Sequence, residues 1–225
     1  MKFEKTEVWG FEHALRGMRN PLESWEKSDS EFLLGIIGKN DLELAQRLIK
    51  AGEPHRKFLR QIFVSVDITA PLYWWKEFDT YKVGTVANST STMHKLASTP
   101  ITKECFEMDD YSEAIYIERE NRHPIATGIN IYWSFIIDAM ENLRQKYNET
   151  KDKRYWKELI RLLPESWLQT RTVTMNYENI LNMRTYRQNH KLTEWSESFI
   201  NWAKSLPYAD EFLFLKESYN KTEIN

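Results

Sequence analysis

The sequence predicts an α+β protein in which several helices pack with a small sheet. Only seven Gly and seven Pro occur among 225 residues, too few for a turn-dense, all-β architecture. Most periodic segments carry apolar residues at helical spacing, whereas one segment alternates with the period of a strand. Helices gathered around a short sheet define the α+β class.

The first 81 residues predict an irregular start, a helix, a strand and a second helix. Residues 1–30 mix charged and aromatic side chains and are expected to be irregular, with a short strand at the beginning. Residues 30–52 are expected to be helical, with Asp41 as the N-cap and Gly52 directly after the last turn. Residues 62–69 alternate as a strand does, and the aromatic-rich segment 72–81 suits a buried helix.

The remainder of the chain is expected to be mainly helical. Residues 84–91 are small and polar and predict a loop. Helices are expected over 131–147 and 154–163. Residues 167–187 are expected to hold either a strand or a short helix, followed by a helix over 178–187, and a last helix is expected over 194–205.

Charge and cysteine content limit the class of function. The chain has 31 Lys and Arg against 33 Asp and Glu, a net charge of -2, so we expect no polymeric nucleic acid as partner. A local basic pocket for a phosphorylated small molecule remains compatible with this balance. Cys105 is the only cysteine, which excludes an intrachain disulfide and a multi-cysteine metal site. His13, His94 and His123 lack metal-ligand spacing, so no metal is expected.

We expect a single domain over residues 1–225, since no repeat or linker divides the sequence. No apolar run is long enough for a membrane span, and no signal peptide is recognisable at the N-terminus. The expected compartment is therefore the cytoplasm, with no membrane partner.

Residues 41–94 contain features in a specific order. A helical segment precedes a glycine turn with His55, which is followed by the strand, Ala70-Pro71 and the aromatic helix. The small polar loop comes last and contains Asn88 and Ser91. This order resembles the central part of flavin-dependent thymidylate synthases.

The signature of that family, Arg-His-Arg followed by Asn, Ser and Arg-Tyr, is altered in this chain. Counted from the shared Ala-Pro, Thr80-Tyr81-Lys82 occupies the Arg-His-Arg position. With one inserted residue, Asn88 and Ser91 match the Asn and Ser, and Met93-His94 replaces Arg-Tyr.

A second block of residues is similar to the same family in the same order. The family has Leu-Pro, Thr-Arg, Asn-Leu-Arg and a downstream His and Trp. The counterparts, with small gaps, are Leu163-Pro164, Thr170-Arg171, Asn182-Met183-Arg184, His190 and Trp195. The resemblance covers residues 40–205.

The resemblance implies a flavin-dependent thymidylate synthase-like fold with a small antiparallel sheet. It also implies a homotetramer with active sites between subunits. Such proteins bind FAD, reduce it with NADPH, and transfer a one-carbon unit from methylenetetrahydrofolate to C5 of dUMP. The protein orients the flavin and fixes the nucleotide phosphate, while the cofactor carries the redox chemistry. We assign no catalytic residue, because this scheme requires no protein nucleophile.

Four side chains are expected to bind the substrate: Arg171, Arg184, Lys82 and Ser91. A guanidinium fork suits a phosphate or a pyrimidine edge, whereas a lysine supplies only a point charge. The alternative is that these cations are solvated surface charges and that residues 84–91 form a tight crossover loop. Ser91 is not expected to act as a nucleophile, since no motif places a base near it.

Five side chains are expected to bind the cofactor: His55, Arg60, Asn88, Asn182 and His190. The segment 55–60 is the densest basic cluster of the chain and could hold a phosphate or a dinucleotide. It could equally be an exposed basic helix start or strand edge, and His190 could be an ordinary loop histidine. Trp74, Trp75 and Phe78 could stack on a flavin, but at helical spacing we expect them in the core or a subunit interface.

Three functional hypotheses follow. The first is an FAD-dependent, thymidylate synthase-like enzyme that acts on dUMP or a related deoxypyrimidine monophosphate, with substrate or C5 chemistry altered by the changed signature. The second is a non-catalytic protein that keeps the fold for nucleotide binding or oligomeric interaction. The third is a small helical regulator whose resemblance is accidental.

Overall fold

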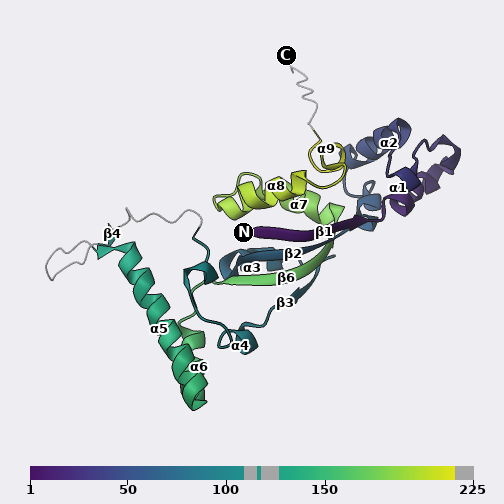
Figure 1. Ribbon diagram of the computed structural model, residues 1–225. Coiled ribbons are helices and arrows are strands. Elements are labelled where there is room, and N and C mark those ends of the chain that lie inside the picture. Colours follow the sequence, from purple (N-terminus) through teal and green to yellow (C-terminus); the bar gives the residue numbers. More distant parts are fainter. Residues whose placement is uncertain (109–115, 118–126, 216–225) are drawn as a thin grey trace. The chain divides into compact units, whose positions relative to one another are not determined.

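The computed structural model describes residues 1–108, 116–117 and 127–215 (Figure 1). Four strands form one sheet in the order β1-β2-β6-β3. Their bounds are β1 Lys2–Trp9, β2 Phe63–Pro71, β3 Val86–Ser89 and β6 Leu168–Asn176. A separate antiparallel pair joins β4 (Tyr116–Ile117) to β5 (Thr127–Gly128).

Side-chain contacts show that β2 and β6 run antiparallel. The hydroxyl groups of Thr69 and Thr170 lie 2.7 Å apart, and Thr172 donates a 2.6 Å hydrogen bond to Asp67. The partner number falls on β2 as it rises on β6, which is the register of an antiparallel pair. All four strands together form a small antiparallel sheet. The alternating apolar residues of segment 62–69 are all buried, so the predicted strand is confirmed: Ile62, Val64, Val66 and Ile68.

The described residues form two compact units. The first unit contains Thr69–Glu77 and Ser89–Arg171, and the second contains Lys2–Ile68, Phe78–Asn88 and the chain from Thr172 onward. The expected single domain stays a prediction. Within the described ranges, no helix is both long enough and apolar enough to cross a membrane.

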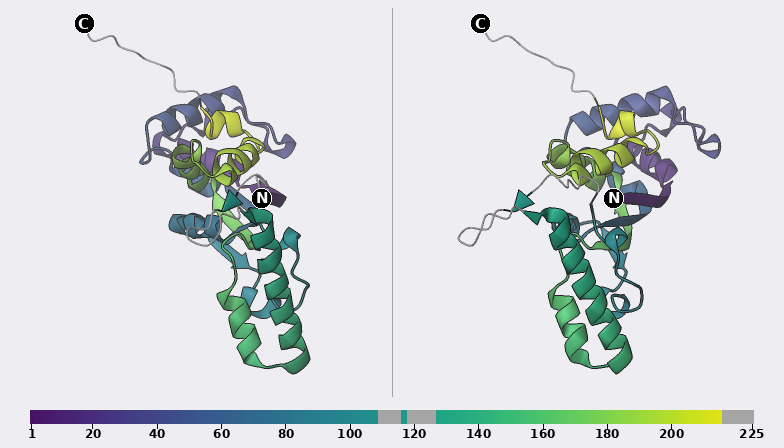
Figure 2. Two further views of the ribbon diagram at one scale, coloured as in Figure 1. Left: turned by 90° about the vertical axis from the view of Figure 1, so that its left-hand side faces the viewer. Right: turned by 60° about the vertical axis from the view of Figure 1, so that its left-hand side comes forward.

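The first unit holds a long helical hairpin. Helices α5 (Ile129–Thr150) and α6 (Lys153–Arg161) lie side by side in Figures 1 and 2. Their apolar residues pack with Leu96, Ile101 and Phe106 around a buried Met140. The unit also contains α3 (Leu72–Phe78, whose last residue belongs to the second unit), α4 (Thr92–Lys95) and a 3-10 turn at Lys103–Cys105.

The second unit is built around an aromatic core. Phe11, Phe58, Tyr177 and Phe212 pack edge to face or tilted, with ring centroids 5.6–6.4 Å apart, a geometry favoured by aromatic quadrupoles. The α-helices of this unit are α1 (Phe11–Arg19), α2 (Lys39–Lys50), α7 (Tyr177–Arg187), α8 (Ile200–Lys204) and α9 (Ala209–Phe212). Short 3-10 turns lie at Asn20–Leu22, Trp25–Lys27, Phe32–Leu34, Lys57–Gln61 and Asp79–Tyr81, and a π-helical segment covers Glu194–Phe199.

The predicted N-cap at Asp41 is wrong. Helix α2 begins at Lys39, and the carboxylate of Asp29 accepts hydrogen bonds from the backbone N–H groups of Asn40 and Asp41. The Asp41 carboxylate instead is buried. It accepts a 2.6 Å bond from Arg19 and further bonds from Ser28 and Ser30. The Asp41 side chain therefore links α2 to the preceding loop and does not serve as the N-cap of the helix.

Other differences concern segments whose sequence signals are weak. Residues 30–38 form a bridged turn, not the start of the helix, and residues 11–19 of the expected irregular region form α1. The predicted loop at 84–91 contains β3, whose side chains are all exposed, so no apolar alternation marked it as a strand. The structure confirms the predicted helices near 131–147 and 154–163. It also confirms the strand alternative at 167–176 and the helix stop at Gly52, where φ is +97°.

The aromatic helix is also confirmed. Helix α3 covers Leu72–Phe78 and continues as the 3-10 turn to Tyr81. Trp74, Trp75 and Phe78 are buried, in agreement with their expected place in the core.

Candidate functional site

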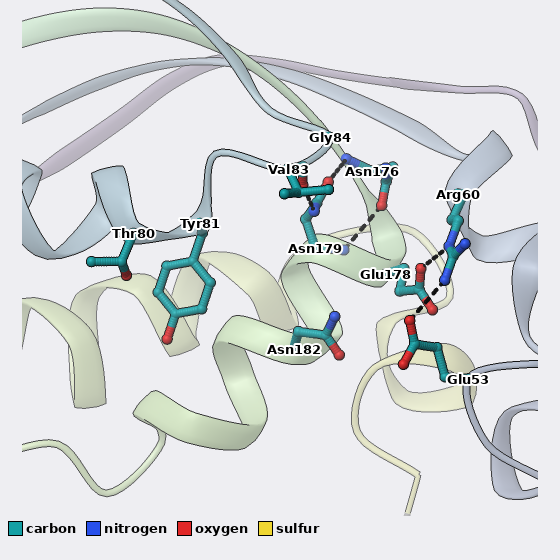
Figure 3. A pocket seen from close by; sticks show the side chains of 10 residues that line it. All are labelled: Glu53, Arg60, Thr80, Tyr81, Val83, Gly84, Asn176, Glu178, Asn179 and Asn182. Carbon is teal, nitrogen blue, oxygen red and sulfur yellow. Dashed lines mark hydrogen bonds and ion pairs between the residues drawn. The ribbon is translucent and has the colours of Figure 1, made fainter.

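The second unit contains a pocket of about 420 Å³ beside the first two turns of α7 (Figure 3). Its wall comes from three segments: the turn after Gly52 with the basic segment that follows it, the chain from Thr80 to Gly84, and residues 176–182. The lining residues are Glu53, Arg60, Thr80, Tyr81, Val83, Gly84, Asn176, Glu178, Asn179 and Asn182.

Reciprocal side-chain bonds cap the N-terminus of α7. Asn176 accepts a 3.0 Å hydrogen bond from the backbone N–H of Asn179, and the Asn179 side chain accepts one of 3.2 Å from the backbone N–H of Asn176. Such a capping box satisfies two backbone donors that the helix itself leaves without partners. The first turn of α7 is thereby fixed in position under the pocket.

The same cap holds the segment that corresponds to the altered signature. The Asn179 amide donates a 2.7 Å hydrogen bond to the carbonyl oxygen of Val83. Gly84 follows with φ +82°, and a Cβ there would lie 3.0–3.2 Å from the side chains of Asn176 and Asn179. Only glycine adopts this backbone conformation without strain and leaves room for the cap.

Two arginines share one buried carboxylate on the pocket wall. Glu178, only 5% exposed, accepts a 3.2 Å bond from Nε of Arg56 and a second bond from Nε of Arg60. Arg60 also pairs with Glu53 at 3.0 Å (Figure 3). The Glu178 carboxylate raises the pKa of Arg60 above its ordinary value by hydrogen bonding and charge attraction. The two cations are therefore balanced by two anions.

A second cluster orients Tyr81, at the other side of the pocket. Arg187 donates a 3.0 Å hydrogen bond from Nε to the Tyr81 hydroxyl oxygen. The Arg187 guanidinium lies 5.1 Å from the centre of the Trp195 ring, and that ring meets Tyr81 edge to face. These contacts hold the Tyr81 ring at the pocket edge.

The uncharged donors of the pocket come from asparagine amides. Asn182 accepts a 3.0 Å bond from Arg56 through its oxygen, and Asn176 uses its oxygen for the cap. Neither side-chain NH2 group has a hydrogen-bond partner within the described ranges. Both can donate to the oxygen of an amide-bearing ring, such as a pyrimidine or an isoalloxazine.

Comparison with solved structures places this geometry in a known fold. No protein-family model and no curated protein matches the sequence. The flavin-dependent thymidylate synthase ThyX from Helicobacter pylori, complexed with FAD and dUMP, has a TM-score of 0.67 at 19% identity, over 96% of this chain and 98% of that one. A second structure of the Helicobacter pylori protein with FAD and dUMP gives the same values. The UMP/dUMP methylase PolB from Streptomyces cacaoi, bound with 5-Br dUMP, has a TM-score of 0.62 at 14% identity, over 95% and 94% of the two chains.

The chain has the fold of flavin-dependent thymidylate synthases. The predicted fold is therefore confirmed, and the resemblance seen in the sequence is not accidental.

Two of the nine predicted binding residues line the pocket together, namely Arg60 and Asn182. His55 is exposed and, with Arg60, lines a separate groove of about 640 Å³ beside α1 and α2. Lys82 is exposed between two lining residues, and Asn88 is exposed on β3.

Arg184 and His190 do not line this pocket. The guanidinium of Arg184 lies 5.2 Å from the centre of the Phe214 ring, and its buried Nε has no hydrogen-bond partner in the described structure. Nδ1 of His190 accepts a 3.2 Å bond from the backbone N–H of Leu192.

Arg171 and Ser91 belong to the first unit. Arg171 lies over the Trp75 ring, 4.2 Å from its centre, and donates to Gln169 at 3.0 Å. Ser91 caps α4 by accepting a 3.2 Å bond from the backbone N–H of His94. The Ser91 oxygen thus has a structural role in its own unit.

Glu178, Asn176 and Asn179 are among the pocket residues that were not predicted from the sequence. An Asn-x-x-Asn spacing before an apolar helix is a capping signal that could have placed the last two. Glu178 could have been inferred only by asking which anion balances the basic cluster at 55–60.

No group of three metal-binding side chains gathers within the described part of the chain. Of the histidines considered above, His123 lies outside the described residues.

Proposed function

We propose that this chain is a flavin-dependent, thymidylate synthase-like enzyme that transfers a one-carbon unit to C5 of a deoxypyrimidine monophosphate, dUMP or a relative of it. The observation that carries the proposal is the composition of the pocket. It joins residues 80–84, where the signature of the family is altered, to residues 176–182, which include Asn182 of the second block similar to the family, in a chain with the family's fold.

The polar groups of the pocket are compatible with a flavin or pyrimidine ring. Both rings present carbonyl oxygens and ring N–H groups, which pair with the amides of Asn176 and Asn182 and with the Tyr81 hydroxyl. FAD, when bound, would supply the electrons of the reaction, with NADPH as reductant and methylenetetrahydrofolate as one-carbon donor. His55, Arg60, Asn88, Asn182 and His190 remain the proposed cofactor contacts.

The substrate phosphate needs cationic donors. Arg56 and Arg60 are paired with Glu178 and Glu53, so we assign the substrate phosphate to other side chains. Arg171 and Arg184 are the proposed fork-shaped donors, with Lys82 and Ser91 as further contacts. No protein nucleophile is part of the proposal.

We further propose a homotetramer with sites between subunits, located in the cytoplasm. The proposed partners are small nucleotides and further copies of the same chain, without polymeric nucleic acid or membrane.

The charge balance of the pocket also supports a second candidate, a non-catalytic nucleotide-binding or oligomeric interaction protein. Thr80-Tyr81-Lys82 supplies no guanidinium where the family has two, and the arginines nearby are neutralised. Loss of two charge-assisted contacts lowers anion affinity by roughly 3 kcal/mol or more if nothing replaces them.

Purification and a flavin assay separate the two candidates. The enzyme is expected to be yellow, with the absorption of an oxidised flavin, and to methylate dUMP or a related nucleotide in the presence of reductant and folate donor. A flavin-free protein that binds a deoxynucleotide supports the second candidate. A protein that takes up neither FAD nor any deoxynucleotide contradicts the first.

A further inference from the structure

Arg60 on the pocket wall and the nearby Arg56 are both held by carboxylates, although a nucleotide pocket commonly leaves such cations available for phosphate. Glu178 lies on α7, whereas Arg56 and Arg60 lie on the turn that precedes β2. The pairing therefore depends on α7 bringing a buried anion to a basic segment more than a hundred residues away in sequence.

The pairing consumes the best phosphate donors of both guanidinium groups. Arg56 uses Nε for Glu178 and Nη2 for Asn182, and Arg60 uses Nε for Glu178 and Nη2 for Glu53. The side-on fork of each guanidinium, which Nε and Nη2 form, is therefore already occupied. An entering phosphate dianion would also meet the two carboxylates at close range, where like charges repel.

The wall also offers uncharged donors. They include the NH2 groups of Asn176, which is 8% exposed, and of Asn182. Amide donors of this kind pair with carbonyl oxygens of a ring and gain little from a full negative charge. The pocket thus combines neutral donors with one cation and two carboxylates among its lining residues, and Arg56 pairs with the Glu178 carboxylate.

We infer that Glu178 is a specificity-determining residue that keeps phosphate out of this pocket, so that the pocket accepts the uncharged, amide-bearing ring of a ligand. This inference deepens the proposed function and rests on it for the identity of the ring. The exposed Glu53 contributes to this effect, because its carboxylate accepts a hydrogen bond from Nη2 of Arg60. The phosphate of a bound nucleotide lies outside the pocket.

The test compares the affinity for dUMP with the affinity for deoxyuridine, measured by calorimetry for the full chain and two variants. In Glu178→Gln the ratio of the two association constants is expected to rise about tenfold in favour of dUMP, since two cations lose their shared anion. Glu53→Gln, at an exposed position, is expected to raise the same ratio about threefold and keeps the test available if Glu178→Gln fails to fold. Glu165→Gln removes a comparable exposed ion pair with Lys76, neither of which lines the pocket, and should leave the ratio unchanged.

An unchanged ratio in both variants overturns the inference, because it would mean that the carboxylates have no effect on phosphate binding. A lower ratio in both also overturns it, because it would mean that the carboxylates orient the arginines toward phosphate. If the chain binds neither deoxyuridine nor dUMP, the proposed function fails. Inorganic phosphate then serves as the probe: weak binding to the wild type and stronger binding to both variants supports the role of Glu178, and equal binding contradicts it.

Discussion

The side-chain amide of Asn179 donates a 2.7 Å hydrogen bond to the carbonyl oxygen of Val83. One residue thus caps α7 and holds the segment that differs most from the signature of the family. The position of that segment depends on the helix cap as well as on its own sequence. Substitutions in the cap should therefore lower the stability of the protein and also displace the pocket wall.

Gly84→Ala tests how closely this segment lies against the cap. The added Cβ would come within 3.0 Å of Asn179, in addition to the cost of a positive φ. Gly35→Ala is the matched control, since φ there is +71° and a Cβ would meet nothing within 4 Å. We expect Gly35→Ala to lower the free energy of unfolding by about 1 kcal/mol and Gly84→Ala to lower it by about 1 kcal/mol more, as measured by urea denaturation. Equal losses would show that the cap yields to the methyl group.

Replacement of Asp41 distinguishes a buried ion pair from a helix cap. Asp41→Ala would leave Arg19 buried without its carboxylate, so we expect the free energy of unfolding to fall by about 3 kcal/mol or more. Asp29→Ala removes only the bonds to the first turn of α2 and should cost about 1 kcal/mol. Both values can be measured by chemical denaturation. A loss of similar size in the two variants would argue against a special role for the Arg19 pair.

Acid should weaken the first unit through Glu141. Hydrogen bonds from Arg144, followed by one from the backbone N–H of Ile101, lower the pKa of Glu141 from 4.5 to about 2. Because the folded pKa is depressed, the stabilisation is complete above the unfolded pKa. It is lost as the pH falls from about 4.5 to about 2.

Comparison of Glu141→Gln with the wild type measures this contribution. The variant should be less stable at pH 7 by about 2 kcal/mol, after allowance for partial solvent screening, and the difference should shrink on acidification to pH 3. Glu158→Gln, which removes an exposed pair with Arg161, is the control and should change stability little at either pH. A constant difference between Glu141→Gln and wild type across this range would contradict the assignment.

Arg184→Ala tests the proposed substrate contacts outside the pocket. If Arg184 binds the nucleotide or FAD, its loss should weaken that ligand about tenfold or more, while the circular dichroism spectrum stays unchanged. The control is Arg154→Ala, since Arg154 is an exposed residue that pairs with Asp152 at the start of α6. Unchanged ligand affinity in Arg184→Ala would remove this residue from the site.

The sequence predicted the parts of the fold that local periodicity determines. The strand at 62–69 alternates in burial because one face lies in the core, and α5 and α6 carry long apolar stripes. Strand β3 was missed because an exposed edge strand has no apolar face, so its pairing with β6 decides its conformation. The role of Asp41 was predicted wrongly because both an N-cap and a buried ion pair can use an aspartate near the start of a helix.

The pocket could be predicted only in part, for a related reason. Arg60 and Asn182 were found from the basic cluster and from the family resemblance. Glu178 was not, because a carboxylate at the start of a helix is ordinary in any sequence. Its role arises only when α7 lies against the turn at 56–60, a tertiary contact that no local pattern encodes.

The long sequence separation of these contacts also bears on how the protein acquires its pocket during synthesis. The bonds from Asn179 to Val83 and from Arg56 to Asn182 join residues 96 and 126 positions apart. At a translation rate of roughly 10 residues per second, the basic segment waits on the order of 12 seconds for its carboxylate. In that interval Arg56 and Arg60 lack the Glu178 carboxylate that pairs with both of them in the folded protein.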